Sequence, residues 1–250
     1  MTKLVLLFLL STYTSCLNTD GFLIQDLNSY GEAHQVVDHS IWDNLLKMYV
    51  NDAGDVNYNS FKNDVQNLDN YITYLSKQVP SKDWSKDEKL AYFINVYNAN
   101  TIKLIIDNYP IKSIKDINNP WSKNLIKIGD KNYSLSDIEH DILRKMDEPR
   151  IHFAINCASV SCPKLLNVAY TSENVETLLE NSAKEFIADT KKNQISKENL
   201  QLSKIFDWYK KDFTINGSLI DYINKYSQIQ IDSGAKISYL RYDWNLNEQH

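Results

Sequence analysis

One predicted helix, between residues 85 and 108, constrains the fold more than any other segment of this chain. Ser85 is followed three residues later by Glu88, which forms a capping box: each side chain accepts a backbone N–H of the other residue. The helix behind it, over residues 89–108, is apolar on almost every face. Such a helix is stable only when other elements cover it, so we predict that it lies at the centre of the domain.

Two amides interrupt this apolar helix. Asn95 and Asn98 are three residues apart and therefore point to one face. A buried amide must be hydrogen-bonded. The pair is therefore expected either to hold the backbone of a neighbouring loop or to bind a substrate.

Shorter periodic segments flank the central helix. Apolar residues spaced three and four apart predict further helices, and alternating apolar residues bounded by turn residues predict short strands. We predict helices over residues 40–50, 61–75, 136–148, 175–188, 205–213 and 219–226, hairpins within 125–134 and 194–202, and strands at 151–155 and 237–240. No repeat or linker divides residues 39–250, which are expected to form one domain. Its predicted class is α+β, predominantly helical, with a small antiparallel sheet.

The first residues have the pattern of an export signal. Lys3 is followed by seven strongly apolar residues, 4–10, which are too few to span a bilayer but are typical of a secretory signal. Small residues before Cys16 resemble a lipobox, although Tyr13 replaces the usual aliphatic residue. We therefore expect residues 1–15 to be a signal peptide, Cys16 to be lipidated and residues 16–38 to form a tether. An ordinary signal peptide is the alternative.

Export would place the protein in the bacterial cell envelope, either in the periplasm or as an outer-membrane lipoprotein held through Cys16.

The charge balance of the chain indicates whether nucleic acid could be a partner. Lys and Arg total 27 against 32 Asp and Glu, with no basic block. Because phosphate binding needs clustered cations, nucleic acid is not expected as a partner.

Residues capable of chemistry gather between positions 138 and 163. His152 opens a stretch that contains Cys157 and Cys162, and His140 lies twelve residues upstream of it. Thiols and imidazoles this close together indicate a chemical site. In an exported protein, however, the same cysteine pair can form a structural disulfide.

These residues belong to several short blocks that occur in a fixed order. The blocks are Phe93–Asn95 with Tyr97–Asn98, Ile138–His140 with Leu143–Arg144, Pro149–Arg150, His152–Ala154, Asn156–Ser159, Ser161–Pro163, Tyr242–Trp244 and Leu246–Asn247. Together they resemble family 547 of the domains of unknown function, over about residues 85–247. Ile94 and Val96 depart from the Trp and Ala common in that family. The resemblance implies relatives among bacterial envelope proteins and plant multidomain proteins, without an established activity.

The first functional hypothesis is a cysteine-dependent acyl-transfer enzyme, such as a peptidase, amidase or transamidase. Cys157 would be the nucleophile, and His140 or His152 would lower the pKa of its thiol and act as the base. Three further residues could orient the imidazole: Glu139, Asp243 and Asn156. This hypothesis predicts a peptide or amide substrate and requires no cofactor.

Two arginines are candidates for substrate binding. Arg144 follows His140 by four residues and is therefore its neighbour on one helix face, while Arg150 lies just beyond that helix. A guanidinium fork binds a carboxylate bidentately, so either arginine could hold a substrate carboxylate. The remaining candidates for substrate contact are Asn95, Asn98 and Trp244.

Two other hypotheses compete with catalysis. In the first, the protein is a non-catalytic envelope lipoprotein in which a Cys157–Cys162 disulfide holds the loop and His140 is an internal packing residue. In the second, Cys157, Cys162, His140 and His152 bind a zinc ion as a Cys2His2 set. Whether Cys157 is a free thiol separates these three hypotheses.

Overall fold

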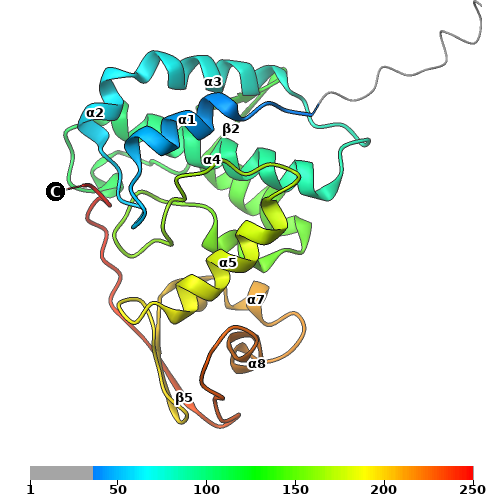
Figure 1. Ribbon diagram of the computed structural model, residues 1–250, viewed down its shortest axis with the longest axis vertical. Coiled ribbons are helices and arrows are strands. Elements are labelled where there is room, and N and C mark those ends of the chain that lie inside the picture. Colours follow the sequence, from blue (N-terminus) through cyan, green and yellow to red (C-terminus); the bar gives the residue numbers. More distant parts are fainter. Residues whose placement is uncertain (1–35, 250) are drawn as a thin grey trace, which may run out of the picture. The chain divides into compact units, whose positions relative to one another are not determined.

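The computed structural model describes residues 36–249 and has a mostly helical architecture (Figure 1). The helices are α1 (Ser40–Tyr49), α2 (Tyr58–Asn63), α3 (Val65–Lys77), α4 (Lys86–Asn108), η1 (Ile114–Asp116), η2 (Asp137–Ile142), η3 (Leu143–Met146), η4 (Pro149–Phe153), α5 (Val175–Ala188), α6 (Ile205–Trp208), α7 (Lys210–Phe213) and α8 (Leu219–Asn224). The strands are β1 (Ile126–Ile128), β2 (Lys131–Tyr133), β3 (Gln194–Ile195), β4 (Asn199–Leu202) and β5 (Lys236–Tyr239). The predicted α+β class is confirmed. The expected signal peptide, Cys16 and most of the expected tether lie outside the described residues.

Helix α4 is the central element, as its capping box predicts. The Ser85 hydroxyl accepts the Glu88 N–H at 3.1 Å, and the Glu88 carboxylate accepts the Ser85 N–H at 2.8 Å. Fifteen of its 23 residues are buried. Helices α2 and α3 pack against it on one side, and α5 and the η2–η3 turns pack against it elsewhere (Figure 1).

Two hydrophobic clusters make up the interior. The first surrounds α4 and includes the buried faces of α1 to α3. The second lies around α5 to α8 and the sheet β3–β4–β5, and four phenylalanines pack in its centre: Phe153, Phe186, Phe206 and Phe213. Trp244 packs against both clusters. The C-terminal segment therefore links the two halves of the interior.

The predicted hairpins and the last predicted strand are present. Strands β1 and β2 pair antiparallel, as do β3 and β4. Strand β5 then pairs parallel with β4, with Leu200 opposite Ile237. The second sheet is therefore mixed, because its third strand arrives from a distant part of the chain.

Four predicted elements differ from the structure. The helix expected over 205–213 is divided at Tyr209 into α6 and α7. The helix expected over 61–75 is divided at Asp64 into α2 and α3, and the helix expected over 136–148 is a π-helical turn followed by a 3-10 turn. The strand predicted at 151–155 is wrong, because Pro149–Phe153 forms the 3-10 helix η4. Pro149 favours the first turn of a helix, and the Glu148 side chain caps that turn by accepting the Arg150 N–H. Alternation over five residues does not distinguish this turn from a strand.

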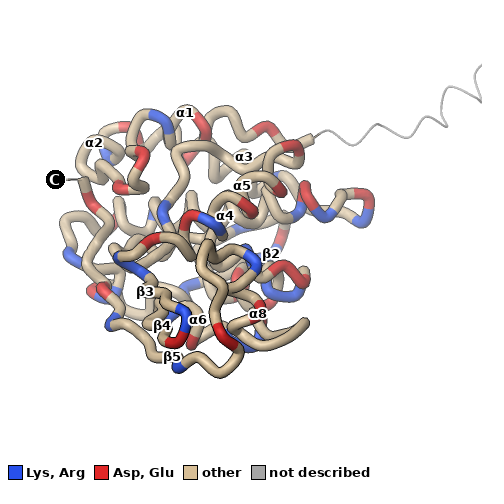
Figure 2. The backbone as a smooth tube through the Cα atoms, turned by 60° about the horizontal axis from the view of Figure 1, so that its bottom comes forward, with Lys and Arg blue, Asp and Glu red and all other residues tan. Residues whose placement is uncertain are grey.

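Charged residues of both signs are interspersed along the chain in the described part (Figure 2). This distribution agrees with the absence of a basic block in the sequence. None of the described helices combines the length and the apolar character that a membrane crossing requires.

His39 makes the stability of this fold sensitive to acid. It is buried next to α1 with its Nδ1 2.7 Å from the Tyr71 hydroxyl, and burial lowers its pKa to about 4. Between pH 6.5 and 4 the unfolded chain takes up a proton that the folded imidazole does not. Over that interval the free energy of unfolding should fall by up to ~3 kcal/mol from this residue alone. Urea unfolding at pH 7 and pH 4.5 should show a smaller acid loss for His39→Gln than for the wild type; equal losses would contradict this assignment.

Candidate functional site

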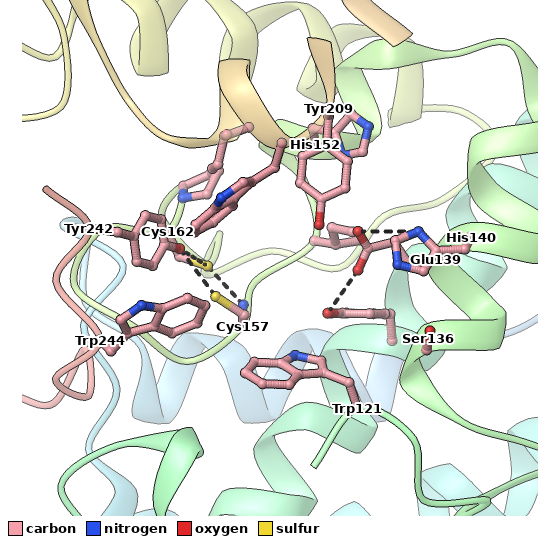
Figure 3. Close-up of a pocket in the computed structure, with 15 residues that line it drawn as sticks. Trp121, Ser136, Glu139, His140, His152, Cys157, Cys162, Tyr209, Tyr242 and Trp244 are labelled. Carbon is pink, nitrogen blue, oxygen red and sulfur yellow. Dashed lines mark hydrogen bonds and ion pairs between the residues drawn. The ribbon is translucent and has the colours of Figure 1, made fainter. Parts of the chain in front are cut away.

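The site is built around a cavity of about 350 Å³. Residues from both hydrophobic clusters line it. Its volume is in the range of small-molecule binding sites. Figure 3 shows Cys157 and Cys162 on one side and Glu139 and His140 on the other. Six Trp and Tyr side chains contribute to the wall: Tyr97, Trp121, Trp208, Tyr209, Tyr242 and Trp244.

A tightly braced loop presents the two cysteines. Helix η4 ends at Phe153, and the Asn156 amide then accepts the Ala158 N–H at 2.7 Å and donates to the Pro163 carbonyl at 2.7 Å. Ala158 has a φ of +58°, a left-handed conformation that is uncommon for a residue with a Cβ atom. Strained backbone of this kind is concentrated at functional sites. Here it turns the chain sharply directly after Cys157.

The two thiols are free and lie against each other. The Cys162 sulfur accepts the Cys157 backbone N–H at 2.9 Å and the Tyr242 hydroxyl at 3.3 Å. The Cys157 sulfur lies 3.2 Å from the Ser159 hydroxyl and 3.3 Å from that of Tyr242. Cys162 therefore has the fuller set of donors that a negative sulfur needs.

These contacts separate the acidities of the two thiols. Burial raises the pKa of Cys162, but hydrogen bonds from the Cys157 thiol, the Tyr242 hydroxyl and the Cys157 N–H outweigh it and bring the pKa to about 6. The hydrogen bond to Cys162, together with burial, holds the pKa of Cys157 well above its ordinary value. These contacts favour loss of the first proton from Cys162 and its retention on Cys157.

The predicted pairing of Cys157 with an imidazole is not formed. His140 and His152 both line the cavity, but neither is hydrogen-bonded to a cysteine. The Nδ1 atom of His140 accepts a hydrogen bond from Arg144 at 3.1 Å. Tyr242 and Ser159 occupy the place beside Cys157 that the sequence assigned to a histidine.

His152 belongs instead to a buried pair with Asp212. Its Nε2 lies 2.8 Å from the Asp212 carboxylate, its ring stacks on Tyr209, and its Nδ1 has no hydrogen-bond partner. Burial lowers the pKa of His152 in spite of the bond to Asp212, so the ring is neutral and Nε2 donates. Burial opposes ionisation of Asp212 as well, but hydrogen bonds from Arg144 and His152 hold its pKa far below the usual range.

Glu139 lies in the cavity wall, and not on a separate face of its helix as α-helical spacing predicts. The wider π-helical turn of η2 brings both Glu139 and His140 to the cavity. Glu139 is 6% exposed; its Oε2 accepts the Tyr97 hydroxyl at 3.4 Å, and its Oε1 has no hydrogen-bond partner. The basic side chain paired with it is His140, whose Nδ1 lies 3.9 Å from Oε1 and accepts a hydrogen bond from Arg144.

Neither candidate arginine is available to bind a substrate carboxylate. Arg144 forms a bidentate pair with Asp212 at 2.6 and 2.7 Å. Arg150 lies away from the cavity wall, with its guanidinium bonded to Glu148 at 2.7 Å and to Glu176 at 2.8 Å. Both guanidinium groups are already paired with carboxylates of the protein itself.

The remaining candidates divide into structural and cavity residues. Asn95 bonds to both backbone polar groups of Tyr170, and Asn98 bonds to the Ala154 carbonyl and the Asn156 N–H. The carboxylate of Asp243 accepts the Asn245 N–H and does not line the cavity. Trp244 lines the cavity (Figure 3).

The geometry does not favour the zinc hypothesis. Within residues 36–249, no group of three or more His, Cys, Asp or Glu side chains is arranged to hold a metal ion. Cys157, Cys162, His140 and His152 line one cavity but do not converge on a point.

Several residues of the site have no signal in the sequence. Trp208 and Tyr209 reach the cavity from α6 and the residue after it, about fifty positions beyond the cysteines. Lys192 donates to the Cys162 carbonyl from beyond the end of α5, and burial lowers its pKa. Trp121 and Tyr97 complete the wall. Only their tertiary placement identifies them.

Comparison with known proteins identifies a family but no activity. Residues 81–187 match the model of a family described as "Protein of unknown function, DUF547". This range contains both cysteines, Glu139 and both cavity histidines, but not Trp208, Tyr242 or Trp244. No curated protein and no solved structure matches the chain.

Proposed function

We propose a thiol-dependent acyl-transfer activity for this chain, of which residues 81–187 match the model of the DUF547 family of unknown function. The observation that carries this proposal is the Cys162 sulfur, which accepts two hydrogen bonds in the cavity wall and has a pKa of about 6. A thiolate at neutral pH is the nucleophilic form of cysteine. The nucleophile is thereby reassigned from Cys157 to Cys162.

Cys157 has a different part in this reaction. The Cys162 thiolate attacks the carbonyl carbon of an ester or amide and forms a thioester, while the leaving group takes the proton of the neighbouring Cys157 thiol. Water then attacks the thioester. Its hydroxyl goes to the acyl carbon, its proton returns to Cys157, and Cys162 leaves as the thiolate. An amine in place of water gives transamidation.

A small activated ester tests this proposal. After incubation with p-nitrophenyl acetate, intact-mass spectrometry should show one hydroxylamine-labile acetyl group, and peptide mapping should place it on Cys162. Cys162→Ala should abolish the adduct, whereas Cys157→Ala, in the same loop, should retain it with slower formation. An adduct that survives in Cys162→Ala, or no adduct while thiol titration shows both cysteines free, would reject the proposal.

We propose further that the protein is exported and anchored to the bacterial envelope through a lipid on Cys16. The support is the apolar segment 4–10 followed by small residues before the cysteine. Labelling of bacterial cells with a fatty acid should mark the full chain but not Cys16→Ser, and the variant should leave the membrane fraction. Unchanged labelling of Cys16→Ser would exclude this anchor.

A further inference from the structure

The acidic groups of this site line the cavity, whereas its cations lie behind the wall. Lys115 Nζ is 5.3 Å from the centre of the Trp244 ring, the Arg144 guanidinium is 5.4 Å from that of Tyr209, and Lys192 donates to the Cys162 carbonyl. The described wall of the cavity contains the Glu139 carboxylate and the acidic Cys162 thiol, and none of its lining residues is a Lys or an Arg. Among the lining residues, His140 is the one basic side chain beside Glu139, but its Nδ1 already accepts a hydrogen bond from Arg144. The Arg144 guanidinium is itself bound by both oxygens of Asp212. The cavity therefore favours a cationic ligand over an anionic one.

The buried Glu139 carboxylate accepts few hydrogen bonds. Oε1 has no hydrogen-bond partner by distance and angle, and Oε2 accepts the Tyr97 hydroxyl at a long 3.4 Å. The Tyr209 hydroxyl points toward the same carboxylate (Figure 3), and burial together with its interaction with Glu139 raises the pKa of Tyr209, but a phenol brings no positive charge. A carboxylate removed from water needs a counter-charge or a full set of donors. A ligand with charged N–H groups would provide both.

Aromatic rings complete the surroundings of such a cation. The Trp244 ring lies 5.7 Å from Trp121, 5.8 Å from Trp208 and 4.5 Å from Tyr242, and all four rings line the cavity. The electron-rich faces of indole and phenol rings attract cations, most strongly where water is excluded. A carboxylate and three indoles in the wall of one cavity suit an organic cation better than a neutral ligand.

We infer that the ligand of this cavity carries a protonated amine, bound between Glu139 and the aromatic wall. In taking that ligand to be the acyl substrate, the inference rests on the proposed function. The ammonium group donates to Oε1 of Glu139, and the acyl carbon extends across the cavity to the thiol side. Glu139 is then a specificity residue that does not take part in bond making.

Binding of two isosteric probes tests this inference without any acyl chemistry. Benzylamine is a cation at neutral pH, and benzyl alcohol is its neutral counterpart. Titrations followed by tryptophan fluorescence and calorimetry should give at least a tenfold lower Kd for benzylamine. Glu139→Gln should abolish that preference without weakening benzyl alcohol, while Glu198→Gln, an exposed control outside the cavity, should preserve it.

Two outcomes would overturn the inference. Equal affinity of the wild type for the two probes would do so irrespective of how the variant folds. So would a preference that persists in Glu139→Gln with its circular dichroism spectrum intact. Failure of the proposed function has a separate signature: neither probe has an acyl group, so loss of the acetyl adduct leaves the benzylamine preference unaffected.

Discussion

Alkylation by iodoacetamide should begin at a lower pH in the wild type than in Cys162→Ser. The wild-type rate is expected to follow the ionisation of Cys162, with a midpoint near pH 6. Of the two cavity cysteines only Cys157 remains in the variant, without its neighbouring sulfur, and its midpoint should return to the ordinary cysteine range near ~8.5. The profile is thus displaced upward by more than two pH units.

The expected rate change at a single pH is smaller than this displacement suggests. At pH 6.5 the thiolate fraction should fall about 70-fold in the variant, but a thiolate of higher pKa is intrinsically more nucleophilic by roughly tenfold, so the net loss is about tenfold. The midpoint, measured by mass spectrometry over a pH series, is therefore the stronger readout.

Cys157→Ser is the matched control for this experiment. The backbone N–H of residue 157 and the Tyr242 hydroxyl, which both donate to the Cys162 sulfur, remain in that variant. Its midpoint should stay in the acidic range. The reverse pattern, with a normal midpoint in Cys157→Ser and an acidic one in Cys162→Ser, would place the negative charge on Cys157 and refute the assignment.

The sequence predicts those parts of this site that depend on local spacing. The capping box at Ser85 locates α4, and the separation of Asn95 and Asn98 places both amides on one helix face, where each holds a loop backbone. His140 and Arg144 contact each other as four-residue spacing predicts. The asparagine pair depends on the regular geometry of α4, whereas His140 and Arg144 keep their contact although η2 and η3 are irregular turns.

The parts that escape prediction depend on long-range contacts or on irregular turns. Asp212, 60 residues beyond His152, binds that histidine, and Tyr242 lies 85 residues beyond the cysteine that it contacts. The π-helical turn brings Glu139 and its neighbour His140 to one cavity, and apolar spacing does not distinguish such a turn from an α-helix. The acidity of Cys162 follows from hydrogen bonds of the Cys157 thiol, the distant Tyr242 hydroxyl and the Cys157 N–H, an arrangement that residue identity does not encode.

Asn98→Leu should destabilise the protein strongly and also raise the pKa of Cys162. The Asn98 amide is 3% exposed, donates to the Ala154 carbonyl at 3.0 Å and accepts the Asn156 N–H at 2.9 Å. Leucine fills a similar volume but leaves both backbone groups buried without a partner. Each unsatisfied group costs about 1–3 kcal/mol, so the free energy of unfolding in urea should fall by about 2–5 kcal/mol.

Asn95→Leu separates the stability effect from the effect on the thiol. Asn95 lies on the same helix face, is fully buried and makes two equivalent bonds, at 2.7 and 3.2 Å, but to Tyr170 and not to the cysteine loop. Both variants should lose comparable stability, and only Asn98→Leu should move the alkylation midpoint upward. Equal midpoints in the two folded variants would mean that Asn98 does not position the Cys157 N–H against Cys162. The acidity of Cys162 would then depend on the hydrogen bonds of Asn156 within the loop and on that of Tyr242 from the C-terminal segment.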